Sequence, residues 1–265
     1  MHATGILDKM PTSFINPVQY FLPLGNDKVA VNEIVGKKLR LQWTGSIFCT
    51  VCGRKTQKSF GEGLCYPCFA NAPENAECIV RPELCEAHLG KGRDPEWEKR
   101  NHFRRHFVYL ALTNSVKVGV TRDDQIPTRW IDQGANQGII LAETPYRQIA
   151  GLIEVELKKH LSDKTNWQRM LKNEVANNID LIIEKERIKM LLPDELSQYV
   201  SDNNEIVELK YPVLDYPTKV TSVSFEKLNP IEMPLIGIRG QYFIFENGYV
   251  FNVRRNSGYE VELDI

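Results

Sequence analysis

Four cysteines form two close pairs in the stretch FCTVCGRKTQKSFGEGLCYPC. Two residues separate the cysteines within each pair and twelve residues separate the pairs; the set is Cys49, Cys52, Cys65 and Cys68. Thiolates at this spacing suit a tetrahedral zinc ion, because each CxxC knuckle presents two sulfurs and the intervening hairpin brings the pairs together. Four thiolates leave no coordination position open for water. We therefore expect a structural Zn²⁺ site of the zinc-ribbon kind.

A redox dithiol is the alternative interpretation of a CxxC pair. It would need only one such pair, at the start of a helix that follows a strand. Gly53, directly after the first pair, and Gly63, before the second, fit the tight turns of zinc knuckles. Residues 48–92 are too poor in apolar side chains to form a core of their own. Metal-coupled folding worth about 10–16 kcal/mol would compensate for the missing core.

A second group of metal-binding residue types follows in CIVRPELCEAHLG, which contains Cys78, Cys85 and His88. Cys85 and His88 have the spacing of a ligand pair, and His102 or His106 would supply the fourth ligand. This second Zn²⁺ site would hold the cysteine-rich region against the next domain. The alternative is that the cysteines are small buried residues and that the histidines form caps or contact phosphate.

The elements that must position these residues are predicted from the pattern of apolar residues. Before the cysteines, PVQYFLPL, KVAVNEIV and LRLQWTGSIF have the composition of strands. After them, DPEWEKRNHF predicts a helix with Asp94 as its N-cap and Pro95 at its first position. Near the end of the chain, YFIFENGYVFNV predicts a hairpin about Asn247 and Gly248.

Between these parts, the strands FVYLAL, VKVGVT and QGIILAE are expected to form a small sheet. The short helix PTRWIDQGA begins at Pro127 and ends near Gly134. The stretch PYRQIAGLIEVELKKHL has apolar residues at helical spacing. One further long helix is predicted for TNWQRMLKNEVANNIDLIIEKERIKMLL, with Thr165 as its cap.

The chain of 265 residues is long enough for several small domains. We expect an N-terminal β segment at 1–47, a zinc-binding region at 48–92, an α/β core at 93–200 and a C-terminal β segment at 201–265. Each β segment alone offers few strands, so the two are expected to pair into a small β-barrel-like part. The predicted fold class is α+β.

The composition narrows the possible classes of protein. No apolar run approaches the roughly 20 residues of a membrane helix, and the N-terminus lacks the pattern of a signal peptide. We therefore expect a cytoplasmic protein with no membrane partner, in which disulfides are rare. The net charge of −1 shows no bias, but six Lys or Arg and no Asp or Glu lie between Lys99 and Arg122. Such a stretch attracts phosphate or is simply a solvated face.

Several motifs resemble a nuclease core. Val108-Tyr109-Leu110, Lys117-Val118-Gly119, Arg129 and a helix bearing Glu154 follow one another as in the GIY-YIG nuclease superfamily, in its variants whose second motif reads K-[IV]-G. This resemblance covers about residues 106–175. Over nearly its full length, the chain also resembles an uncharacterised bacterial family, domain of unknown function 2797, at CTVCGRKTQKS, RPELC, VYLA, VKVGVTR, PTRWIDQGA and GIRGQY.

The GIY-YIG resemblance implies a small three-stranded sheet with helices and a site for phosphodiester hydrolysis. By this resemblance, Tyr109 positions or deprotonates water, Arg129 contacts the scissile phosphate and Glu154 binds Mg²⁺ or Mn²⁺. These residue types fit the reaction, because arginine and a metal ion stabilise the developing negative charge. Lys117 replaces the superfamily's second tyrosine and is either a base with a lowered pKa or a phosphate contact. Glu156 is the alternative metal ligand.

Each of these residues also has an ordinary structural explanation. A strand tyrosine is usually in the core, an arginine beside Trp130 covers that ring, and a helix glutamate is usually solvated. The preferred hypothesis is an endonuclease that acts on DNA or RNA. The alternatives are a non-catalytic DNA- or RNA-binding module on the same frame, and a zinc-stabilised scaffold for another protein. The sequence specifies neither the kind of nucleic acid nor an oligomeric state.

Overall fold

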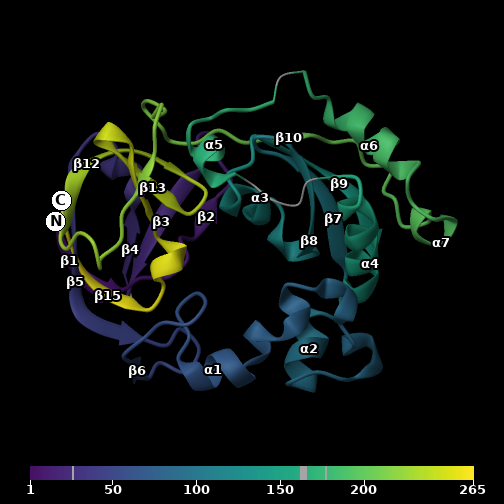
Figure 1. Ribbon diagram of the computed structural model, residues 1–265, viewed down its shortest axis with the longest axis horizontal. Coiled ribbons are helices and arrows are strands. Elements are labelled where there is room, and N and C mark those ends of the chain that lie inside the picture. Colours follow the sequence, from purple (N-terminus) through teal and green to yellow (C-terminus); the bar gives the residue numbers. More distant parts are fainter. Residues whose placement is uncertain (26, 162–165, 177) are drawn as a thin grey trace.

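Strands from both ends of the chain make up the largest sheet of the computed structural model, which describes residues 1–25, 27–161, 166–176 and 178–265 (Figure 1). In order across the sheet they are β1 (His2–Ile6), β15 (Tyr259–Asp264), β5 (Lys38–Phe48), β12 (Ile231–Arg239), β13 (Tyr242–Phe245), β14 (Tyr249–Asn252) and β11 (Thr221–Ser222), with β6 (Lys55–Thr56) paired to β5. The two chain ends lie side by side, and the amino group of Met1 donates to the carbonyl of Ile265 at 2.8 Å.

The predicted pairing of the two terminal segments is confirmed, but the predicted barrel is wrong. In the described part of the chain, the strand order runs from β1 at one edge to β11 at the other, and no pairing joins these edges. β11 has two residues, which is too short to close the sheet on itself. A separate small sheet shares the apolar core of the large one; its strands are β2 (Thr12–Ser13), β3 (Gln19–Leu24) and β4 (Asp27–Ala30).

The predicted three strands of the α/β core are confirmed and a short fourth strand joins them. Their order is β10 (Val207–Glu208), β9 (Gln137–Thr144), β7 (His106–Leu112) and β8 (Val116–Arg122), all antiparallel. All seven residues of β7 are buried, because alternate side chains enter two different cores. Val108 and Leu110 face one core, whereas Tyr109 and Ala111 face the core shared with the large sheet.

The helices are short and several lie on the core sheet. α4 and α6 pack their apolar residues against the sheet face that bears Val108 and Leu110. Within the described residues, α4 is the longest helix, with 12 residues, and no helix is long and apolar enough to cross a membrane. The helices are α1 (Tyr66–Asn71), α2 (Pro95–Asn101), α3 (Thr128–Asp132), α4 (Arg147–Lys158), α5 (Trp167–Leu171), α6 (Leu181–Lys189) and α7 (Asp194–Ser197).

The single long helix predicted over residues 165–192 is wrong, because α5 and α6 are separate. Asn173 and Asn178 have φ angles of 55° and 60°, in the left-handed region that ends a helix. The side chain of Asp180 then accepts hydrogen bonds from two N–H groups at the start of α6 and forms a new N-cap. Thr165, the predicted cap, lies outside the described residues.

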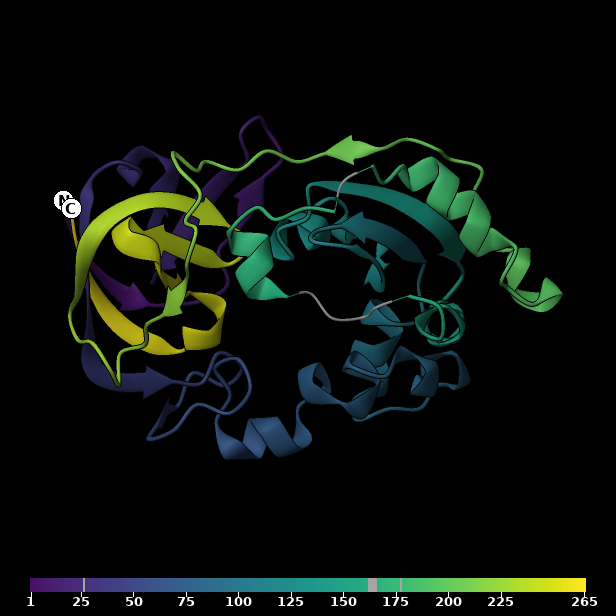
Figure 2. The same cartoon turned by 45° about the horizontal axis from the view of Figure 1, so that its top comes forward.

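The cysteine-rich region connects the two large sheets. From the end of β5 the chain runs through α1, a series of short 3₁₀ turns and α2 to the start of β7, along the bottom of Figures 1 and 2. The predicted start of α2 is confirmed, since the Asp94 carboxylate accepts a hydrogen bond from the N–H of Trp97 at 3.0 Å. The region therefore contacts the large sheet at one end and the α/β core at the other.

Candidate functional site

One cavity of about 270 Å³ is lined by all four residues expected to form a nuclease site: Tyr109, Lys117, Arg129 and Glu154. They come from four elements, β7, β8, α3 and α4. β8 is the edge strand of its sheet, so side chains from both sides of the sheet can reach one opening. α4 buries Ile153 against the sheet, which leaves the adjacent Glu154 at the cavity.

Gly119 of the K-V-G motif lies directly opposite Tyr109 in the β7–β8 hairpin. A Cβ atom at residue 119 would lie 2.4 Å from the hydroxyl oxygen of Tyr109. The tyrosine ring therefore occupies the space that a larger residue would need. Glycine at this position allows Tyr109 to extend beneath β8 to the cavity.

We expect Gly119→Ala to displace the Tyr109 ring and to destabilise the protein by about 1–3 kcal/mol, as overpacking of a core does. Chemical denaturation of Gly119→Ala, Tyr109→Leu and the double variant measures the coupling between the two positions. The smaller side chain at residue 109 removes the clash, so the double variant should be more stable than the sum of the two single effects predicts. Additive effects would contradict this packing argument.

Three polar atoms at this cavity are buried and form no hydrogen bond of good geometry within the described part of the chain, although Tyr109 lies near Arg129 and Gln133. They are the hydroxyl of Tyr109, Nε of Arg129 and the side-chain oxygen of Gln133, and all three residues line the cavity. Leaving a buried polar group unpaired costs about 1–3 kcal/mol, so such groups are rare. Their concentration around one cavity is typical of a site that binds a polar ligand.

The cavity carries more positive than negative charge. Lys117, Arg129, Arg147 and Lys158 line it together with one carboxylate, that of Glu154. Nζ of Lys158 lies 3.3 Å from Oε2 of Glu154, so these two charges partly compensate each other. The remaining positive charge favours an anionic ligand such as phosphate, and burial strengthens that attraction.

Burial also changes the proton affinities of these groups. Desolvation, together with the charge of Arg129, lowers the pKa of Lys117 to about 8. This agrees with the sequence hypothesis of a desolvated lysine beside that arginine. Burial raises the pKa of the Tyr109 hydroxyl, and Arg129 opposes the rise only in part. Burial also raises the pKa of Glu154, against the opposing effect of Lys158.

Of the two candidate metal-binding carboxylates on α4, Glu154 faces the cavity. It is 8% exposed and lines the cavity wall. Glu156 is partly exposed and forms an ion pair with Lys159, and it is absent from the described lining of the cavity.

Two buried side chains that the sequence analysis did not single out hold α3, which carries Arg129. Arg239 is 0% exposed and its guanidinium donates hydrogen bonds to the carbonyl of Gly134 at 3.1 and 2.9 Å. Gln241 donates to Oδ1 of Asp132 at 2.9 Å. The motifs GIRGQY and PTRWIDQGA therefore meet in space. A charged residue between apolar strand residues was the signal that could have indicated this.

The first cysteine cluster brings four sulfurs together. The Sγ atoms of Cys49, Cys52, Cys65 and Cys68 lie within 4.8 Å of one another. Those of Cys52 and Cys65 are 3.7 Å apart, and a tetrahedral zinc ion with bonds of about 2.3 Å separates its sulfurs by roughly 3.8 Å. Burial opposes ionisation of Cys49, but the N–H groups of Cys52, Cys65 and Val51 outweigh it and lower the thiol pKa to about 6. The cluster can hold a metal ion and is consistent with zinc.

Glycines shape the two turns of this cluster as expected. Gly53 and Gly63 have φ angles of 69° and 95°, which favour glycine. The N–H of Gly53 donates to the carbonyl of Cys49 at 2.8 Å and closes the first turn. A Cβ atom at Gly63 would lie 2.6 Å from the side chain of Thr50, so the second turn packs tightly against the first.

Three of the four residues expected at a second metal site also come together, with a different fourth member. The group that could hold a metal ion consists of Cys78, Cys85, Glu98 and His102. His88 lies outside it, and its ring stacks on that of Tyr146 at a centroid distance of 4.6 Å. His106 also lies outside it, with Nδ1 at 2.8 Å from the carbonyl oxygen of Arg104.

Comparison with known families decides the classification of the chain. The model of the family described as protein of unknown function (DUF2797) matches residues 36–261. The chain belongs to this family. A search of curated proteins and a search of solved structures each return no significant match. The DUF2797 match includes both cysteine groups, the four cavity residues and the two motifs that meet at α3.

In this DUF2797 chain, the basic stretch from Lys99 to Arg122 does not by itself form the positively charged cavity. Arg104 pairs with Asp123 at 2.6 Å and with Asp124 at 3.0 Å. Arg105 and Arg122 pair with the same two carboxylates at 3.1 and 3.2 Å. Because two carboxylates offset most of this charge, the attraction for an anion depends mainly on the buried cations of the cavity.

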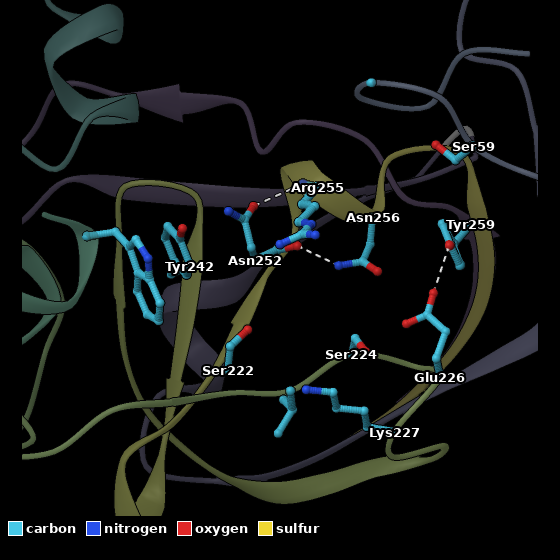
Figure 3. Close-up of a pocket in the computed structure, with 13 residues that line it drawn as sticks. Ser59, Ser222, Ser224, Glu226, Lys227, Tyr242, Asn252, Arg255, Asn256 and Tyr259 are labelled. Carbon is cyan, nitrogen blue, oxygen red and sulfur yellow. Dashed lines mark hydrogen bonds between the residues drawn. The ribbon is translucent and has the colours of Figure 1, made fainter. Parts of the chain in front are cut away.

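A larger cavity of about 530 Å³ lies beside the C-terminal strands of the DUF2797 chain (Figure 3). Its wall includes Lys227, Tyr242 and Arg255, with Ser59 from the cysteine-rich region at one side. The rings of Trp167 and Tyr242 stack at this wall with a centroid distance of 5.9 Å and an interplanar angle of 5°. None of the four predicted nuclease residues lines it.

Proposed function

We propose that the protein is a divalent-metal-dependent endonuclease of the GIY-YIG type that hydrolyses phosphodiester bonds in DNA or RNA. The observation that carries the proposal is the single cavity lined by Tyr109, Lys117, Arg129 and Glu154. The resemblance requires a tyrosine, an arginine and a glutamate to converge from separate elements, and these residues do so around the edge strand β8. The unpaired polar atoms and the excess of positive charge support the same proposal.

Arg129 is the group that contacts the scissile phosphate. Its side chain lines the cavity, and its Nε has no hydrogen-bond partner within the described residues, so a donor is available for a phosphate oxygen. Arginine presents several N–H groups in a planar arrangement that matches phosphate oxygens. Its charge stabilises the negative charge that develops as the P–O bond to the leaving group breaks.

Glu154 would hold Mg²⁺ or Mn²⁺. One buried carboxylate facing a phosphate-binding cavity fits this role, because Mg²⁺ is commonly bound through one or two carboxylates, phosphate oxygens and water. The bound cation would supply further stabilisation of charge on the phosphate. Glu154 would then exchange its contact with Lys158 for contact with the cation.

Lys117 is the proton acceptor in this proposal, and Tyr109 a hydrogen-bond donor. The raised pKa of the buried tyrosine keeps its hydroxyl protonated near neutral pH, so it orients water or phosphate without removing a proton. The lysine, with a pKa of about 8, has an appreciable neutral fraction under the same conditions. The attacking water gives its proton to that neutral amine while its oxygen forms the new bond to phosphorus.

The pH dependence of cleavage distinguishes this role from a simple phosphate contact. If neutral Lys117 is the base, the rate of cleavage should rise with pH up to about 8 and stay constant above it. If the protonated amine binds phosphate, the rate should fall above that pH. Lys117→Arg keeps the charge and removes the base, so we expect inactivity. Full activity of Lys117→Arg would assign a binding role to this residue.

The Cys49, Cys52, Cys65 and Cys68 cluster is proposed to be a zinc ribbon that helps to grip the substrate. Ser59 and Gly61, from the same region, line the larger cavity, whose wall also bears Lys227 and Arg255. Within the described residues, neither of these two basic side chains forms a salt bridge. Stacked aromatic rings beside basic side chains also suit nucleic-acid strands. This cavity therefore favours the second candidate function, nucleic-acid binding without cleavage.

A cleavage assay on the zinc-loaded full chain tests the proposed function. Supercoiled plasmid, branched DNA and structured RNA are incubated with Mg²⁺ or Mn²⁺, with a chelator as the control. We expect cleavage of at least one substrate that stops on addition of the chelator. Absence of cleavage by folded protein would overturn the nuclease proposal. Binding that weakens steeply with salt in the same samples would then support the binding module, since phosphate contacts release counterions.

A further inference from the structure

We propose that Cys78, Cys85, Glu98 and His102 bind a second zinc ion, with Glu98 in the place that the sequence hypothesis gave to His88. The four ligand atoms lie within 4.8 Å of one another. Two sulfurs, one imidazole nitrogen and one carboxylate oxygen are all donor types that zinc accepts in a tetrahedral site. Four protein ligands fill such a site, so its role is structural.

One separation between a sulfur and a nitrogen in the group is close to that expected around a bound ion. Sγ of Cys78 and Nδ1 of His102 are 3.8 Å apart. A tetrahedral zinc ion with a sulfur bond of about 2.3 Å and a nitrogen bond of about 2.0 Å would separate these atoms by roughly 3.5 Å. Glu98 and His102 are four residues apart at the end of α2, which places them on one face, and the carboxylate contacts the same Nδ1.

The burial of Glu98 is the observation that points most directly to a cation. Its side chain is 2% exposed, and within the described residues its carboxylate pairs with the imidazole of His102, another member of the group. A buried carboxylate is strongly unfavourable unless hydrogen bonds or a positive charge compensate it. Its neighbours in the group, two thiols and an imidazole, are side-chain types that bind zinc. A divalent ion between them would compensate the buried carboxylate more fully than the single imidazole does.

The chain before α2 is built around this carboxylate. Gly92 has a φ angle of 152°, and a Cβ atom there would lie 2.3 Å from Cγ of Glu98. The backbone therefore approaches the glutamate side chain more closely than any other residue type would permit. An ordinary solvated glutamate would need no such space.

The metal centre also fixes one wall of the nuclease cavity, a consequence that rests on the proposed function. Ile79, Val80 and Pro82 line that cavity and lie between the two cysteine ligands in the sequence. Arg147 of α4 donates hydrogen bonds to the carbonyls of Cys78 and Ile79 at 3.0 and 2.9 Å. The segment is thus held by the metal at both ends and by α4 along its length.

The contact with α4 is close. A Cβ atom at Gly151 would lie 2.1 Å from the backbone nitrogen of Glu83, so the segment rests directly on the helix backbone. Gly151 is three residues before Glu154, the proposed metal ligand of the nuclease site. Loss of the zinc would release this segment and open the cavity beside Glu154.

The metal content of the purified full chain, measured by inductively coupled plasma mass spectrometry after dialysis against a weak chelator, tests the zinc site. We expect two zinc ions per native chain, and one in Glu98→Ala and in His102→Ala. Glu96→Ala changes an exposed carboxylate on the same helix, and His88→Ala removes the histidine outside the group. Both controls should keep two zinc ions.

One zinc ion per native chain would overturn the proposal, and this measurement needs no variant to fold. Loss of one ion from His88→Ala, with both retained in Glu98→Ala, would overturn the assignment of Glu98. The cleavage assay separates the two proposals. A native protein with two zinc ions and no cleavage would overturn the nuclease and leave the zinc site standing. Unchanged cleavage by Glu98→Ala with one ion would overturn the role of the metal in the cavity wall.

Discussion

Glu154→Gln is expected to abolish divalent-metal-dependent cleavage while the protein stays folded. The substitution keeps the size of a side chain that is 8% exposed and removes the charge that would hold the cation. Losing a group that stabilises the transition state typically lowers the rate constant by about 10²–10³-fold, and a metal ligand should reach at least this range. Cleavage rates at saturating Mg²⁺ and Mn²⁺, with circular dichroism to establish folding, provide the measurement.

Glu156→Gln is the matched control, since it makes the same chemical change two residues away on α4. Its carboxylate pairs with Lys159 outside the described cavity lining, so we expect cleavage close to that of the native protein. Full activity in Glu154→Gln, with loss of activity in Glu156→Gln, would exchange the roles of the two carboxylates. Equal activity of all three proteins would refute a metal-binding glutamate on this helix.

Features that depend on neighbouring residues could be predicted from the sequence. The β7–β8 hairpin and the strand β9 follow from apolar runs bounded by turn residues. The turn between β13 and β14 follows from Asn247 and Gly248, which both have positive φ angles. The first cysteine cluster could be predicted for the same reason, because its two CxxC pairs lie within one short stretch of the sequence.

Features that depend on contacts between distant residues could not be predicted in the same way. Glu98 looks like an ordinary solvated helix residue in the sequence, and only the fold places it beside Cys78 and Cys85. His88 has better ligand spacing but turns away to stack on Tyr146. Local spacing therefore gave three of the four members of the second group, and the fourth depends on how α2 packs.

The contacts that hold α3 in place join residues that are even further apart in the sequence, so they could not be predicted either. Arg239 and Gly134 are separated by 105 residues, and their hydrogen bonds form only because the large sheet packs against the α/β core. The arginine of GIRGQY had no partner visible in the sequence. Arg239 therefore positions Arg129 through the end of α3, without contacting the cavity itself.

Cys65→Ser is expected to unfold the cysteine-rich region around the first cluster and leave the two large sheets intact. Cys65 is 2% exposed, and the apolar cluster around it has only three buried members in the described residues, Cys49, Leu64 and Cys65. So small an apolar core is not expected to order the region by itself. Zinc contributes about 10–16 kcal/mol to comparable sites. Losing one of four ligands should therefore convert the region to a largely disordered segment.

Metal content and limited proteolysis measure this effect together. Cys65→Ser should hold one zinc ion fewer than the native chain and be cleaved by trypsin within residues 49–71, where we expect the native chain to resist. Tyr66→Phe is the matched control, because it changes an adjacent side chain that is 64% exposed and offers no ligand. Native zinc content and protease resistance in Cys65→Ser would contradict a structural metal at this cluster. Loss of all secondary structure would instead show that the two sheets depend on the zinc as well, through the contact of Gly63 with Ser257.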